Sequence, residues 1–159
     1  MTMASGHSQT TGTQPTAAGP TAAEPTAARP AADSTENGSS IIFLERVEGL
    51  AIAAAAAVLY ARTGASWWLF AAVWLVPDLS MLGYLGGACR GARIYNAFHT
   101  YIAPGVLAVC ALLPGAHFAL TIALIWANHI GVDRLLGYGL KYGNGFGFTH
   151  LGRMGKQRA

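Results

Sequence analysis

Beyond residue 40 the chain alternates between long apolar stretches and short connections rich in glycine, serine, threonine and proline. The apolar stretches cover residues 41–62, 67–85, 94–113 and 117–136. Each holds about 20 residues, so as a helix each is about 30 Å long and matches the hydrocarbon thickness of a bilayer. The pattern therefore predicts an all-α fold, specifically a four-helix transmembrane bundle.

The first 40 residues follow a different pattern. A five-residue quasi-repeat starts at Pro15 and reads PTAAG, PTAAE, PTAAR, PAADS. Proline in every repeat blocks a continuous helix, and the tract has no large apolar side chain to bury. We therefore expect three parts: a disordered Pro/Ala/Thr-rich tail (residues 1–40), a transmembrane domain (41–137) and a glycine-rich, aromatic and basic cytoplasmic segment (138–159).

Composition and charge support a membrane location. Of the 159 residues, 53% are hydrophobic and 11% are charged, whereas an ordinary soluble domain is roughly a quarter charged. Lysine and arginine gather on the N-terminal side of the predicted bundle, and only Arg62 belongs to the two short loops on the other side. The positive-inside rule then predicts a multi-pass protein of the cell membrane with both termini cytoplasmic. The net charge of +3 is too small and too scattered for nucleic-acid binding.

Each apolar stretch also carries polar side chains toward its cytoplasmic end. They are Glu45 and Glu48, Asp78, Asn96 and His99, and His129 and Asp133. At the rise of an α-helix, one such residue of each stretch lies about 8–10 Å below the membrane boundary. Pairs within a stretch are three or four positions apart, so each pair projects from one helix face. Ionisable groups are costly in hydrocarbon and mark functional sites, so we expect these residues to share one cavity.

Two imidazoles beside several carboxylates form a ligand set suited to a divalent metal such as Zn, Fe or Mn. The predicted metal ligands are Asp78, His99, His129 and Asp133, which together with Glu48 are also the predicted catalytic residues. Asp78 follows Pro77, which favours a break in the helix at this point. Two alternatives stay open, namely a metal-free acid/base site and a structural network in which the carboxylates are neutralised by Arg46, Arg93 or Arg134.

The C-terminal segment interleaves tyrosine and phenylalanine with Lys141 and Arg153. It lacks the spacing of a phosphate-binding loop. It suits either anchoring at the interface or a lid over the site, with Lys141 meeting an anionic headgroup or a phosphate and His150 completing the cluster. The other predicted substrate-binding residues are polar or aromatic and lie toward the same face: Asn96, Tyr84, Tyr95 and Tyr101. His117 belongs to the opposite face and is excluded.

The residues named above belong to longer motifs: Arg46-Val-Glu-Gly, Pro77-Asp-Leu-Ser-Met-Leu-Gly-Tyr, Tyr95-Asn-Ala-Phe-His-Thr-Tyr, His129-Ile-Gly-Val-Asp-Arg, Gly137-Tyr-Gly-Leu-Lys-Tyr and Thr149-His-Leu-Gly. Together these motifs resemble a family of small bacterial four-helix membrane proteins that is known only as a domain of unknown function. The resemblance covers about residues 44–156, leaves out the tail, and implies the fold and the choice of residues but no reaction. A looser likeness links the Pro-Asp and histidine motifs to membrane-bound metal-dependent hydrolases.

We therefore expect a small intramembrane enzyme, metal-assisted or acid/base, that acts on a lipid or isoprenoid substrate entering from the bilayer. The reaction would be hydrolysis, isomerisation or cyclisation. The expected partners are membrane lipids and this hydrophobic substrate. The alternatives are a non-enzymatic binding protein, an ion or proton conduit, and a structural subunit of a membrane complex. A conduit would be a homo-oligomer, because four helices leave little room for a pore.

Overall fold

The computed structural model describes residues 32–153, which are mostly helical. The helices are α1 (Ala32–Arg62), α2 (Trp67–Trp74), the 3-10 helix η1 (Pro77–Gly86), α3 (Ala88–Phe98), α4 (Ile102–Cys110) and α5 (His117–Leu136). Two short strands, β1 (Phe148–Thr149) and β2 (Gly152–Arg153), pair antiparallel near the C-terminus.

The first helix begins earlier than the hydrophobic pattern indicates. Residues 32–40, which we expected to belong to the disordered tail, form the first turns of α1. The last proline of the quasi-repeat is Pro30, and beyond it nothing prevents the backbone from making helical hydrogen bonds. The rest of the predicted tail, residues 1–31, lies outside the described residues.

The second and third predicted stretches are both interrupted. The break between α2 and η1 falls immediately before Pro77, and the break between α3 and α4 falls at residues 99–101. The third stretch also starts earlier than expected, because Gly87 turns the chain with a φ of 102° and α3 begins at the next residue. Arg90 and Arg93 therefore lie on a helix and not in a loop.

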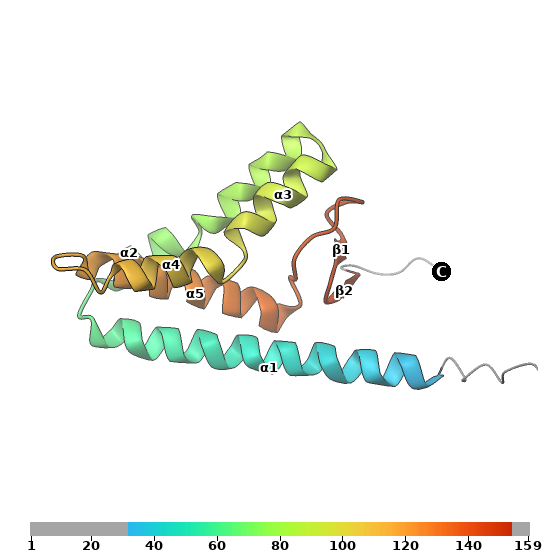
Figure 1. Ribbon diagram of the computed structural model, residues 1–159, viewed down its shortest axis with the longest axis horizontal. Coiled ribbons are helices and arrows are strands. Elements are labelled where there is room, and N and C mark those ends of the chain that lie inside the picture. Colours follow the sequence, from blue (N-terminus) through green and yellow to red (C-terminus); the bar gives the residue numbers. More distant parts are fainter. Residues whose placement is uncertain (1–31, 154–159) are drawn as a thin grey trace, which may run out of the picture. The chain divides into compact units, whose positions relative to one another are not determined.

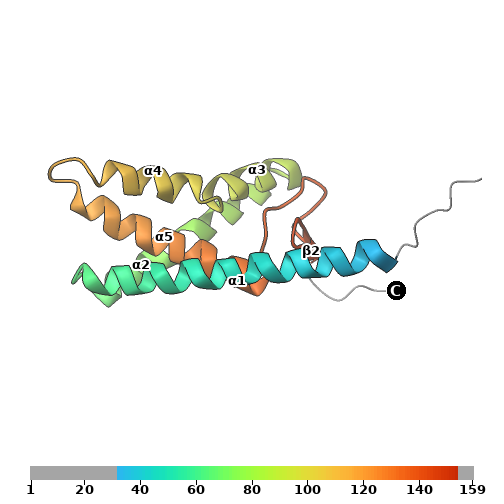
Figure 2. The same cartoon turned by 60° about the horizontal axis from the view of Figure 1, so that its bottom comes forward.

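Helix α5 is the centre of the packing. It contacts α1, α2 and α4, while α3 pairs with η1; α1 and α5 lie side by side in both views (Figures 1 and 2). Gly49 and Gly131 allow the close approach of α1 to α5, since a Cβ atom at Gly131 would lie 2.7 Å from the Gly49 carbonyl oxygen. Small residues at a helix crossing are typical of membrane helices.

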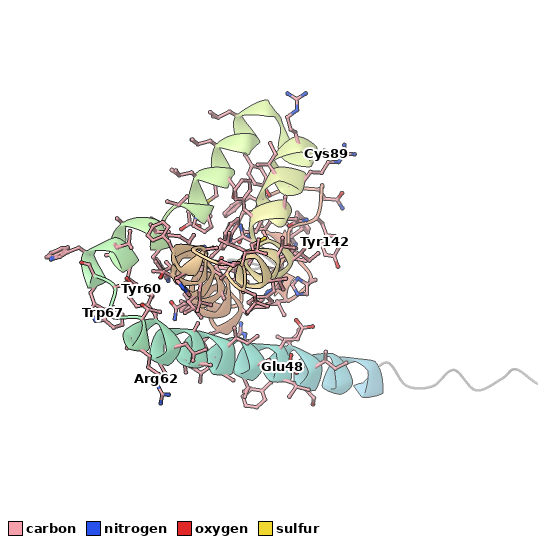
Figure 3. All side chains as sticks on the ribbon, turned by 60° about the vertical axis from the view of Figure 1, so that its left-hand side comes forward. Glu48, Tyr60, Arg62, Trp67, Cys89 and Tyr142 are labelled. Carbon is pink, nitrogen blue, oxygen red and sulfur yellow. The ribbon has the colours of Figure 1, made fainter. Side chains whose placement is uncertain are left out.

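A compact core lies where the end of α1 meets α2 and α5. The core holds Ala56, Tyr60, Leu124 and Ile125, and the Tyr60 ring contacts Trp67 with 5.1 Å between centroids. Figure 3 shows Tyr60 and Trp67 close together, whereas Glu48 lies toward the N-terminal end of α1. These contacts fix α1 and α2 against α5, and thereby the residues that α2 and α5 contribute to the site.

Many large apolar side chains outside this core are exposed. They lie on every helix and include Leu50, Trp68, Leu82, Leu85, Phe98, Ile102, Val106 and Phe118. Within the described residues, two stretches, Trp67–Gly86 and His117–Leu136, are long and apolar enough to cross a membrane. Their length and the extent of exposed apolar surface fit a lipid environment for this part of the chain.

Candidate metal centre

Two members of the predicted cluster lie at the interruptions of the helices. Asp78 is the second residue of η1, directly after the break before Pro77, and His99 follows the last residue of α3. His129 and Asp133 come from one face of α5, where they are one turn apart. Helix breaks thus bring side chains from two interrupted segments against an unbroken helix.

The four side chains place their ligand atoms within 4.8 Å of one another. His99 Nε2 lies 3.6 Å from Asp78 Oδ1 and 3.5 Å from Asp133 Oδ2. His129 Nε2 lies 3.6 Å and 3.8 Å from the same two oxygens, and the two Nε2 atoms are 3.3 Å apart. In a tetrahedral site with metal–ligand bonds of about 2.0–2.1 Å, ligand atoms are about 3.3–3.4 Å apart. These five separations, of the six among four atoms, are therefore close to those of a tetrahedral metal site.

Tyr95 orients two members of the cluster. Its backbone carbonyl accepts a hydrogen bond of 2.9 Å from His99 Nδ1, and its ring stacks on the His99 ring at 3.7 Å. With the hydrogen on Nδ1, the lone pair of His99 Nε2 points into the cluster. The Tyr95 hydroxyl donates to Asp133 Oδ2 at 3.3 Å. Supporting contacts of this kind fix the tautomer and the direction of metal ligands.

The other histidine is held by aromatic packing. The His129 ring meets Trp74 edge to face at 4.8 Å, and Trp74 Nε1 donates to Asn128 Oδ1 at 2.9 Å. Asn128 Nδ2 in turn donates to the Ala53 carbonyl of α1 at 2.8 Å. From the sequence we assigned no role to Trp74 or Asn128. The position of Asn128, an amide directly before His129 in an apolar helix, could have indicated its role.

The cluster is closed on one side and open on the other. The side chains of His99 and His129 are 2% and 1% exposed, and that of Asp133 is 13% exposed. The Asp78 side chain is 35% exposed. Water or a substrate can therefore approach from the side of Asp78.

The chain matches the family described as Domain of unknown function (DUF4260) over residues 43–154. It belongs to this DUF4260 family. Neither a curated protein nor a solved structure matches the chain. The match includes Asp78, His99, His129 and Asp133 and the C-terminal segment as far as β2, so both the cluster and this segment belong to the family domain.

In this DUF4260 chain the C-terminal segment is joined to α3 by hydrogen bonds with the side chain of Asn96. The Asn96 side chain accepts a hydrogen bond of 2.7 Å from the Lys141 backbone N–H and donates one of 2.9 Å to the Lys141 carbonyl. The Lys141 side chain is buried, with Nζ 4.2 Å from the Phe146 ring centre and 5.1 Å from that of Tyr95. Burial lowers the pKa of Lys141, and the charge of Asp133 opposes this shift.

Other predicted site residues lie apart from the four ligand atoms. His150 contacts Glu45 and Arg134, so it supports a neighbouring region and does not complete the cluster. Glu48 and Tyr101 line a separate cavity. Tyr84 packs against Gly91 and, edge to face, against Phe146 within the region of η1 and α3. The helix end before His99 is fixed by Trp126, whose Nε1 donates to the Phe98 carbonyl at 2.8 Å.

Proposed function

We propose that Asp78, His99, His129 and Asp133 bind one divalent metal ion and that the protein is a metal-dependent membrane enzyme. The observation that carries this proposal is the set of five ligand-atom separations between 3.3 and 3.8 Å. Four nitrogen and oxygen donors in a near-tetrahedral arrangement suit Zn best among Zn, Fe and Mn. A bound cation would also offset the repulsion between the two carboxylates.

The same site supports hydrolysis of a hydrophobic substrate. A metal of this kind polarises a substrate oxygen and activates water. His99 and His129 are enclosed, whereas Asp78 forms the open side, so substrate and water reach the cluster past Asp78. The exposed apolar surface of the helices favours a substrate that arrives from the bilayer, such as a phospholipid or an isoprenoid.

We further propose that the chain crosses the membrane four times with both termini in the cytoplasm. The first span is the apolar part of α1, the second is α2 with η1, the third is α3 with α4, and the fourth is α5. The distribution of lysine and arginine supports this orientation. Interrupted helices are tolerated at membrane depth where they line an internal site, which is the position of Asp78 and His99.

Metal analysis of the purified protein tests the proposal. Protein prepared in mild detergent should hold near-stoichiometric metal, measured by inductively coupled plasma mass spectrometry. His129→Ala and Asp78→Asn should each remove most of it, because each deletes one ligand of four. His117→Ala is the matched control, since His117 is an exposed histidine at the far end of α5.

The control variant should keep the metal content of the unaltered protein. Metal-free protein that is folded, and whose thermal unfolding is unchanged by both His129→Ala and Asp78→Asn, would contradict the proposal. A proton conduit would instead show pH-driven flux in liposomes that Asp78→Asn abolishes, with no bound metal.

A further inference from the structure

Beside the metal-ligating cluster lies a polar cavity of about 250 Å³ between α1, the start of α4, the end of α5 and the C-terminal segment. We name it the α1 cavity; its lining residues are Glu45, Glu48, Gly49, Ile52, Tyr101, Arg134 and His150. It is smaller than the ~300–1,000 Å³ pockets that enclose a drug-sized ligand. Its size therefore fits a small polar group.

One wall of the cavity presents an open carboxylate. Leu140 N–H donates to His150 Nδ1 at 2.8 Å, so Nε2 carries the ring hydrogen and donates it to Glu45 Oε2 at 3.2 Å. Glu45 is thereby paired with His150. Glu48, one turn further along α1, makes no ion pair with any residue that the structure describes. The free acceptor in the cavity is therefore Glu48.

The opposite wall presents donors. Arg134 Nη1 lies against His150 Nε2, but a guanidinium has five N–H donors. Arg134 Nη2 makes one long contact of 3.5 Å with the His99 carbonyl, which leaves guanidinium donors for another acceptor. The Tyr101 hydroxyl is enclosed and has no hydrogen-bond partner in the described part of the chain. Guanidinium and hydroxyl donors together suit a phosphate.

We propose that the α1 cavity binds a phosphoethanolamine headgroup, with its ammonium at Glu48 and its phosphate at Arg134 and Tyr101. Two carboxylates against one guanidinium leave an excess negative charge that favours a ligand carrying a cation. A metal ion is disfavoured here, because the metal-ligating atoms found close together in residues 32–153 belong to the other cluster. A choline headgroup has no N–H to donate to Glu48, and a glycerol headgroup has no cation.

An intact lipid fits the surroundings of the cavity. Along α1 the carboxylates of Glu45 and Glu48 come first, and the exposed apolar side chain of Ile52 follows one turn later. This order matches a lipid whose headgroup faces the cytoplasm and whose acyl chains run along the helix. Lipid binding in the α1 cavity does not require the metal. The further statement that the bound lipid is the substrate rests on the proposed function.

Native mass spectrometry of the full chain tests the site. The protein is equilibrated with equal amounts of phosphatidylethanolamine, phosphatidylcholine and phosphatidylglycerol that carry identical acyl chains. We expect retention of phosphatidylethanolamine about fivefold above either competitor, the upper end of what a partly exposed ion pair supplies. Glu48→Gln should reduce this ratio to about one. Tyr101→Phe should lower retention of all three lipids alike, while Tyr142→Phe, at an exposed tyrosine, should not.

Three further readouts complete the test. Equal retention of the three lipids by the unaltered protein overturns the site, and so does an undiminished preference in folded Glu48→Gln. If soluble phosphoethanolamine displaces the bound phosphatidylethanolamine, the headgroup alone is recognised. If the lipid stays bound in its presence, the protein recognises the intact lipid. Metal content is measured on the same samples. If the protein shows no lipid preference but holds metal, only the headgroup site is contradicted. If it shows the lipid preference but holds no metal, only the metal centre is contradicted.

Discussion

At the scale of single residues, Tyr95 holds His99 and Asp133 in place at the same time. Its carbonyl and ring fix the His99 imidazole, and its hydroxyl reaches the Asp133 carboxylate. Tyr95 lies on α3 and Asp133 on α5, so the contact also ties the two helices together next to the ligand atoms. The hydroxyl can be removed without losing the ring.

Tyr95→Phe should therefore weaken metal binding without unfolding the protein. The ring still stacks on His99, but Asp133 loses a hydrogen bond that orients it, and loss of such a contact typically costs at least about tenfold in metal affinity. Competition with a chelator of known affinity measures the change. Tyr142→Phe removes a hydroxyl from an exposed tyrosine and should leave the affinity unaltered. Equal affinities for both variants would show that Tyr95 does not support the metal ligands.

The four residues that cluster in the structure could be selected from the sequence because each is an ionisable group within an apolar stretch. The location of Glu48, away from this cluster, could not be predicted from the sequence. Gly49 is buried against α5, and successive helical residues are rotated by about 100°, so Glu48 points to the side of the crossing and not into it. The sequence contained both residues, but only the contact of α1 with α5 shows which one faces inward.

At the scale of helices, the position of the cluster depends on two breaks and one crossing. The break before Pro77 was predictable, because proline cannot continue the hydrogen-bonding pattern of the preceding turn. The break at residues 99–101 was missed, although Pro104 in the first turn of α4 was a usable signal. Proline is tolerated in a first turn, so its position indicated that a new helix starts just before it.

The crossing of α1 and α5 yields a prediction at this scale. Gly131→Ala should destabilise the protein by about 1–3 kcal/mol, the usual cost of overpacking. The added methyl would lie 2.7 Å from the Gly49 carbonyl oxygen and 2.9 Å from the Ala53 backbone nitrogen, so the helices must separate to admit it. Thermal unfolding in detergent measures the change.

Gly105→Ala is the matched control for this substitution. Gly105 also lies within a helix, but a Cβ atom there meets nothing within 4 Å. Higher helix propensity of alanine should therefore stabilise the protein by up to about 1 kcal/mol. If Gly131→Ala proved as stable as Gly105→Ala, the close contact of α1 and α5 would be wrong.

At the scale of the whole molecule, composition and the spacing of apolar stretches were sufficient to predict a mostly helical chain with helices that could cross a membrane. Two stretches, Trp67–Gly86 and His117–Leu136, have the length and composition of membrane spans. The pairing of η1 with α3 and of α5 with three other helices could not be read from the sequence. Such pairings depend on which faces meet, and most apolar faces of this chain are equally able to meet lipid or another helix.

The cysteines allow the proposed orientation to be tested. Cys89 is exposed near the start of α3 and Cys110 is exposed at the end of α4. If both termini are cytoplasmic, Cys89 belongs to the cytoplasmic end of its span. In a Cys110→Ala background, a membrane-impermeant maleimide should therefore label Cys89 in inverted membrane vesicles and not in intact cells, as judged by mass shift.

A reporter on the opposite side completes this prediction. Thr63 lies in the exposed turn between α1 and α2, so Thr63→Cys, combined with Cys89→Ala and Cys110→Ala, should react in intact cells. Reversal of both patterns would place the termini outside, and the arginine and lysine bias would then not set the orientation. If Cys89 and Thr63→Cys were labelled from the same side, both positions would lie on one face of the membrane, and the segment between them would not cross it once. Asp78 and His99 would then not belong to two interrupted spans, because α2 with η1 would no longer connect the two faces.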